Sequence, residues 1–198
     1  MIKRAQWIGV AGIPSEQVLK RLGLVDTGQA VLYKPSITAY AVFRPGWTVV
    51  VHPAELPPDK ETYEALSAEG QAVICAFDDA SRFSTAQGFQ RGELLWSMIH
   101  EGSGSQREPD LDAIGSLPIQ FSDIADRLMA DQAEAVREGR ASDGLYRAPM
   151  ELCHAVCGFR ADIVDPDAIW PTMTHAMKPT PASRRRRLAS SLSSLFSR

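Results

Sequence analysis

The sequence predicts an α+β fold, with an antiparallel meander sheet of about six strands, helices packed on one face, and a disordered basic C-terminal tail. Short apolar stretches between turn residues dominate the first half of the chain, and helical periodicity dominates the second half. Strands in consecutive runs followed by helices favour an antiparallel sheet over alternating βαβ units. The chain is divided into a single domain over residues 1–177 and a Ser/Arg-rich flexible tail over residues 178–198.

A first strand is predicted over residues 5–11, and Ser15 is expected to cap a short helix after it. Three further apolar stretches are separated by turn sequences such as Pro45-Gly46, in which proline sets φ and glycine tolerates a positive φ. These stretches predict a meander of strands. They are residues 29–33, 37–43 and 47–51.

A second meander is predicted between residues 72 and 100, after a short helix that Asp59 is expected to cap. Alternation in its last strand places Trp96 and His100 on the same face. The strands are residues 72–77, 83–89 and 93–100.

The second half of the chain predicts helices. Residues 102–116 are rich in Gly, Ser and charge and predict a loop, and the longest helix follows from 117 to about 139, where we expect it to lie across the sheet. Pro149 fits the first turn of another helix, and Gly158 fits its C-cap. Residues 162–177 are expected to pack on the domain as an irregular covering segment.

Charge is distributed unevenly along the chain. The formal net charge is −3, and the tail contributes +6, which leaves −9 for residues 1–177. An acidic body makes nucleic acid an unfavourable partner for the folded domain and favours a basic protein partner. No apolar stretch approaches the roughly 18–20 residues of a membrane span, and the N-terminus does not read as a secretory signal, so a soluble, cytoplasmic protein is predicted.

A histidine and several carboxylates form the candidate for acid–base chemistry. If consecutive strands pair, the turn at Asp78-Asp79 and the strand end at His100-Glu101 lie at one edge of the sheet. Such groups can exchange protons, but aspartates in a hairpin turn also serve its local hydrogen bonds. The candidate catalytic residues are His100, Glu101, Asp78 and Asp79. The candidate ligand-binding residues are Trp96 and His100, because an apolar floor with one polar group is the general form of a small-ligand site.

Two of the three cysteines, Cys153 and Cys157, lie one helical turn apart and could donate two thiolates to a metal. A tetrahedral site needs two more ligands, and His154 points about 100° away from them on the helix. Core packing is therefore the expected role. No metal and no cofactor is predicted.

The tail allows two interpretations. Its apolar residues recur at helical spacing, which suits a basic amphipathic helix that contacts an anionic membrane or a partner groove. A disordered tail with solvated arginines is the alternative. The candidate contact residues are Arg184, Arg185, Arg186, Arg187, Leu188, Leu192, Leu195 and Phe196.

The leading functional hypothesis is a non-enzymatic protein-interaction module with an acidic body, of the immunity or adaptor type. One alternative is a small enzyme or small-ligand binder that uses a cleft near Asp78, Trp96 and His100. The other is a peripheral membrane protein attached through the basic tail.

Overall fold

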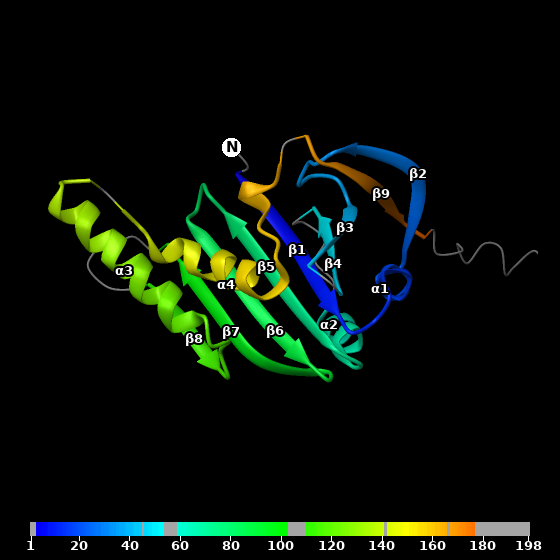
Figure 1. Ribbon diagram of the computed structural model, residues 1–198, viewed down its shortest axis with the longest axis horizontal. Coiled ribbons are helices and arrows are strands. Elements are labelled where there is room, and N and C mark those ends of the chain that lie inside the picture. The colour runs from blue at the N-terminus through cyan, green and yellow to red at the C-terminus, as the bar shows by residue number, and fades with distance from the viewer. Residues whose placement is uncertain are drawn as a thin grey trace, which may run out of the picture.

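The computed structural model describes residues 3–44, 46–53, 59–102, 110–140, 142–165 and 167–176. Within them, nine strands form one sheet in the order β2-β9-β3-β4-β1-β5-β6-β7-β8, and every pairing is antiparallel (Figure 1). The α+β class is confirmed, and the sheet is larger than the six strands predicted.

The strands are β1 (Arg4–Ala11), β2 (Leu24–Leu32), β3 (Ala39–Phe43), β4 (Trp47–His52), β5 (Gln71–Asp78), β6 (Phe83–Gln90), β7 (Glu93–Glu101), β8 (Asp112–Gly115) and β9 (Ile169–His175). The helices are α1 (Ser15–Arg21), α2 (Lys60–Ser67), α3 (Phe121–Arg137) and α4 (Ala148–Cys157), and two short 3₁₀ turns are η1 (Leu145–Arg147) and η2 (Ala161–Ile163).

The N-terminal strand β1 lies in the interior of the sheet, where it pairs with β4 on one side and β5 on the other. Its residues Trp7, Ile8 and Val10 are fully buried. A strand covered on both faces needs a continuous apolar stretch, and the sequence of β1 provides one.

Helices cover both faces of the sheet, which corrects the prediction that they pack on one face. Trp7, Val73 and Cys75 face α4, whereas Ile8, Val50 and Ile74 face α1 and α2. The short helices α1 and α2 each carry too few apolar residues to form a core of their own, and they pack on the face opposite α4.

The helix that crosses the sheet is α4, and the prediction that α3 would do so is wrong. Seven of the ten residues of α4 are buried, and it contacts β5, β6 and β7 (Figure 1). Helix α3 packs beside α4 and buries only Ala125, Leu128 and Ala135 along its length. Its narrow apolar stripe suits contact with one helix better than contact with a sheet.

Close approach of α4 to the sheet depends on a glycine in β1. A Cβ added at Gly9 would lie 3.0 Å from Cys157 Cβ.

The three cysteines are free and buried, and burial raises the pKa of Cys157 to about 12 and that of Cys75 well above its usual value. The Cys75 and Cys157 thiols therefore stay protonated, and the buried cysteines act as small apolar side chains.

Two strands lie where no strand was predicted. Strand β8 falls within the predicted loop, and β9 replaces the predicted irregular cover and pairs with β2. Strand β2 also begins earlier than expected, at Leu24. Its register with β9 shifts between Asp26 and Ala30, so the two strands pair on both sides of Gly28.

Two of the three predicted helix caps are confirmed. Asp59 accepts a hydrogen bond from the Thr62 backbone N–H at 2.9 Å, and Gly158 closes α4 with a φ of 81°. Pro14 takes the N-cap of α1, and the Ser15 hydroxyl instead bonds the Thr48 hydroxyl at 2.7 Å.

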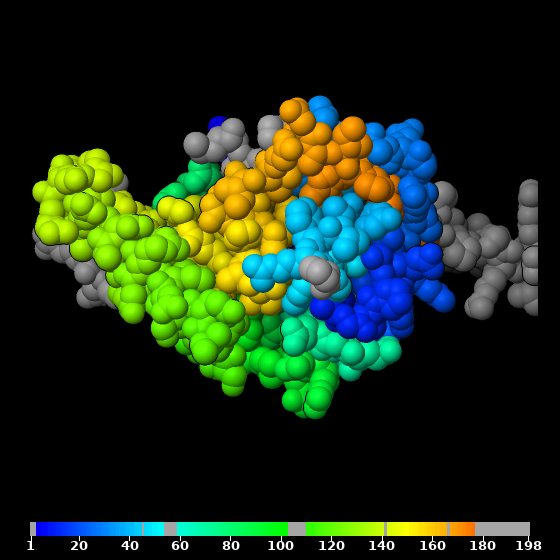
Figure 2. Space-filling view, viewed as in Figure 1, coloured from blue at the N-terminus to red at the C-terminus, as the bar shows by residue number. Residues whose placement is uncertain are grey.

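The predicted basic tail, with its candidate contact residues, lies outside the described residues. The space-filling view shows α4 (gold) between α3 (yellow-green) and strands β3 and β4 (cyan), where it hides the middle of the sheet (Figure 2). In the described part of the chain, no helix has the length and apolar character that a bilayer crossing requires.

Candidate functional site

The strand register brings the predicted acid–base candidates to the same end of the sheet. Asp78 pairs with Phe83, and Phe83 pairs with Glu101. His100 therefore lies one residue from the row that contains Asp78. The side chains divide between the two faces, because residues directly opposite share a face and neighbours along a strand do not.

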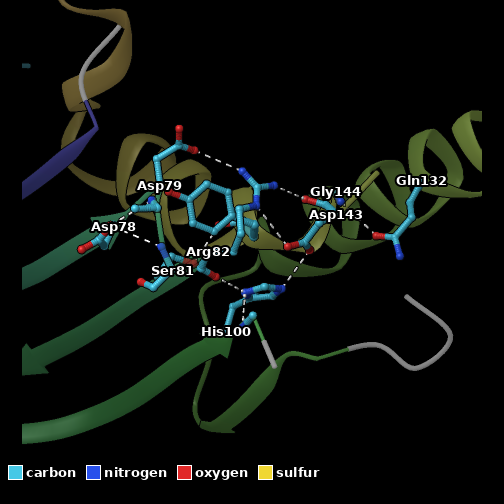
Figure 3. Close-up of polar contacts among 12 residues, drawn as sticks. Asp78, Asp79, Ser81, Arg82, His100, Gln132, Asp143 and Gly144 are labelled. Carbon is cyan, nitrogen blue, oxygen red and sulfur yellow. Dashed lines mark hydrogen bonds and ion pairs between the residues drawn. The ribbon is translucent and has the colours of Figure 1, made fainter. Parts of the chain in front are cut away.

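His100 is buried on the α4 side, and both of its ring nitrogens have partners (Figure 3). Nε2 lies 2.9 Å from Asp143 Oδ1, to which it donates. Nδ1 lies 2.9 Å from the Arg82 carbonyl oxygen, and the Gly102 N–H lies 3.4 Å from the same nitrogen. The ring is thus fixed between the β5–β6 turn and the segment before η1.

Arg82 links Asp79, in the β5–β6 turn, to Asp143, in the segment before η1 (Figure 3). Its guanidinium forms ion pairs with Asp79 Oδ1 at 3.1 Å and Asp143 Oδ2 at 3.4 Å, and it donates to the Asp143 carbonyl at 3.1 Å. The guanidinium carbon lies 3.9 Å from the centre of the Tyr146 ring, a cation–π distance. Asp79, Arg82, His100, Asp143 and Tyr146 are called the Arg82–His100 network below.

Neighbouring hydrogen bonds fasten the same segment to the sheet and to α3. The Ser84 hydroxyl donates to the Tyr146 carbonyl at 2.7 Å, and the Gly144 N–H donates to Gln132 Oε1 at 3.0 Å. Asp78 instead serves its own turn, because its Oδ1 accepts from the Ala80 N–H at 2.9 Å. The network joins the β5–β6 turn, the end of β7, and the connection between α3 and η1.

The geometry of the network suits anchoring better than proton transfer to a substrate. A histidine–aspartate pair needs a free ring nitrogen facing a nucleophile or substrate, and both nitrogens of His100 face backbone or carboxylate groups. Ser84 lies directly across from His100, but its hydroxyl is bonded to Tyr146. The Glu101 side chain is exposed on the opposite face of the sheet.

Trp96 and His100 share a face but not a cleft. They lie four positions apart on β7, about 13 Å at the usual strand rise, and the buried side chain of Met98 lies between them. Trp96 lines a hollow at the opposite end of the strands, with Gln71, Gln90 and Leu95.

A second charged cluster surrounds Glu151 on α4, which the sequence had not indicated. Arg127 from α3, Arg147 from η1 and Arg160 approach its buried carboxylate, the last two at 2.8 and 3.4 Å. Arg147 is close in distance but lies outside hydrogen-bond geometry, so it holds Oε1 by charge alone. The cluster ties α3 and η1 to α4.

The side of the sheet away from α4 is covered by α2 only in part. Beyond α2, Phe83, Leu94 and Ile114 are 37%, 43% and 66% exposed. Thr85 and Ile99 lie between them and are partly buried. These five residues are called the open face below.

Carboxylates border the open face. Asp78 and Glu101 are the direct cross-strand neighbours of Phe83 on either side, and Asp112 is the neighbour of Ile99. Arg4, 3.8 Å from Asp78, is a basic residue at this border. An apolar centre with an acidic border differs from the α4 side, where the charges are paired within the fold.

No group of three or more His, Cys, Asp or Glu side chains is placed to hold a metal ion within the described ranges. Comparison with protein-family models, with curated proteins and with solved structures found no match. The strands, helices and exposed side chains define the chain as an α+β protein with an open, acid-bordered sheet face.

Proposed function

We propose that this protein is a non-enzymatic interaction module whose open face binds a basic segment of another protein. The observation that carries the proposal is the position of Phe83, with an exposed ring between the carboxylates of Asp78 and Glu101. The complementary segment places one apolar side chain against Phe83, another against Ile114, and lysines or arginines opposite the acids.

Exposed apolar side chains supply the affinity in this proposal. Interfaces are stabilised mainly by a few apolar or aromatic anchors that lose water on binding, surrounded by a polar rim. Phe83, Leu94 and Ile114 come from three neighbouring strands, so an extended segment can touch all of them at once.

Charge supplies orientation and selectivity. Residues 1–177 carry a formal charge of −9. A field of that sign attracts basic partners over distances near the Debye length and repels acidic ones. The carboxylates around Phe83 convert this general attraction into a local preference.

The experiment selects binders from a displayed random-peptide library against the whole protein and then tests the binders on two matched variants. Ile114 and Ile169 have almost equal exposure, 66% and 68%, but only Ile114 belongs to the open face. Ile114→Glu is expected to weaken binding at least about tenfold, as expected when an interface anchor is lost, while Ile169→Glu leaves it unchanged.

Selected sequences are expected to be basic around an apolar residue, and their affinity should fall as salt is raised. Binders of no particular charge that tolerate both Ile114→Glu and Phe83→Ser would contradict the proposal. Chemical-shift mapping of a selected peptide gives the contact residues directly.

Membrane attachment through residues 178–198 and a cytoplasmic location remain predictions from the sequence. The first is tested with anionic vesicles and a chain that lacks residues 179–198. Equal vesicle binding by the full and shortened chains would exclude the tail as the attachment site.

A further inference from the structure

A hollow on the α4 side of the sheet has the features of a separate small-ligand site. It occupies about 230 Å³ at the end of strands β5, β6 and β7, away from the Arg82–His100 network. Its lining includes Gly88 of β6 and Trp96 of β7, together with Val156 of α4 and Pro118. We call this the Trp96 hollow.

A hydrogen-bond donor without a partner in the described part of the protein borders the hollow. Trp96 is only 5% exposed, and no residue of the described chain accepts a hydrogen bond from its Nε1. A Cβ on Gly88 would lie 2.1 Å from this nitrogen, so the N–H edge of the indole occupies the space above the glycine. Trp7 Nε1 is fully buried without a partner among the described residues, whereas Trp96 Nε1 is not fully buried, and Trp96 lines the hollow.

The other polar groups of the hollow are uncharged. Gln71 and Gln90 are direct cross-strand partners, and each amide side chain can donate and accept. None of the described lining residues is ionisable, so a charged ligand group would lose water without gaining a counter-ion. Leu95 and Val156 add an apolar wall.

We propose that the Trp96 hollow binds an uncharged acetamido group, as carried by an N-acetylated amino sugar or an N-acetylated amino acid. The carbonyl oxygen accepts from Trp96 Nε1–H. The amide N–H donates to a glutamine side-chain oxygen, and the methyl group contacts Leu95 and Val156. Each part of the group thereby meets a complementary part of the lining.

Space for the rest of such a ligand adjoins the hollow. A second hollow of about 390 Å³ shares Gln71 and Gln90 with the first and continues past Trp47 and Gly70. The two amides at the boundary can therefore bind the acetamido group on one side and the body of the ligand on the other.

The test is an NMR titration of the whole protein with N-acetylglucosamine and N-acetylalaninamide, with glucose as the control that lacks the acetamido group. The indole N–H of Trp96 is identified by its contact with the Gly88 α-protons. It is expected to shift saturably with a Kd on the order of 1–10 mM, a normal affinity for so small a group.

Variants separate specific binding from general surface contact. Gln71→Leu and Gln90→Leu are expected to weaken binding about tenfold each, equivalent to one lost hydrogen bond. Gln29→Leu, an exposed glutamine on β2, leaves it unchanged. The probe that binds more tightly identifies whether the group comes from a sugar or an amino acid.

Absence of a Trp96 indole shift up to about 50 mM ligand, well above the expected Kd, would overturn the proposal. An equal shift with glucose, or unchanged affinity in both glutamine variants, would overturn it as well. These outcomes do not bear on the open face, which lies on the other side of the sheet.

Discussion

Glu151 is a buried carboxylate that three arginines from different segments approach. Burying a carboxylate costs free energy unless charges and hydrogen bonds replace the lost water. Arg160 is itself mostly buried, while Arg127 and Arg147 are about half exposed, so only part of the charge interaction escapes solvent screening.

Glu151→Ala is expected to lower the free energy of unfolding by about 2 kcal/mol, less than the full cost of an unpaired buried charge because two of the arginines can turn toward water. Urea unfolding measures the change. Asp131→Ala removes an exposed carboxylate 3.9 Å from the same Arg127 and serves as the matched control, with an expected loss below about 0.5 kcal/mol. Equal losses of unfolding free energy in the two variants would show that the buried Glu151 cluster stabilises the fold no more than an exposed ion pair does.

Single residues also mark the limit of prediction for the site. The sequence placed Asp78, Asp79, His100 and Glu101 at one end of the sheet, because consecutive strands pair in order. It did not indicate Asp143, which lies 61 positions from Arg82 along the chain. No periodicity connects a loop aspartate to a turn arginine, and only the folded position of α4 and η1 brings them together.

At the scale of elements, the Arg82–His100 network acts as the attachment of the α3–η1 connection to the sheet. Helix α3 buries few residues of its own and depends on its neighbours for position. Asp143 supplies contacts to both His100 and Arg82.

Asp143→Ala is expected to loosen the attachment and to destabilise the fold by about 1–3 kcal/mol, the usual cost of leaving buried polar groups without a partner. Hydrogen exchange should then rise in α3 and η1 while β1 and β5 stay protected. Asp112→Asn, an exposed aspartate on β8, is the control. Uniform exchange over the whole chain in Asp143→Ala would argue against a local attachment.

The elements differ in how well their sequences predict them. Strands β1, β5, β6 and β7 were predicted because their apolar residues are continuous or alternate between clear turns. Strand β8 has four residues, and two of them are Asp and Gly. Strand β9 contains Pro171 and an exposed Ile169 and is held by pairing with β2. Pairing with a distant strand leaves little mark on a local sequence pattern.

At the scale of the whole molecule, titration of a buried histidine contributes to stability. Burial lowers the pKa of His52 below its usual value, with His175 nearby adding to the effect and a hydrogen bond to the Pro53 carbonyl opposing it. The unfolded chain therefore binds a proton more readily than the folded chain.

The free energy of unfolding is expected to fall as pH drops below about 6.5, the ordinary histidine pKa, and to be steady above it. Urea unfolding at a series of pH values measures this dependence, and His52→Gln should flatten it. Burial also lowers the pKa of His154, so His154→Gln should remove a smaller part of the slope. An unchanged slope in His52→Gln would show that another group is responsible.

The interior position of β1 affects how the chain folds during its synthesis. Strand β1 is synthesised before β4 and β5, and one of its edges stays unpaired until the chain has been made up to Asp78. Until then, a strand rich in buried residues exposes unpaired backbone and apolar side chains to other chains. Slow translation between β1 and the end of β5 would prolong this interval and raise the demand for chaperones.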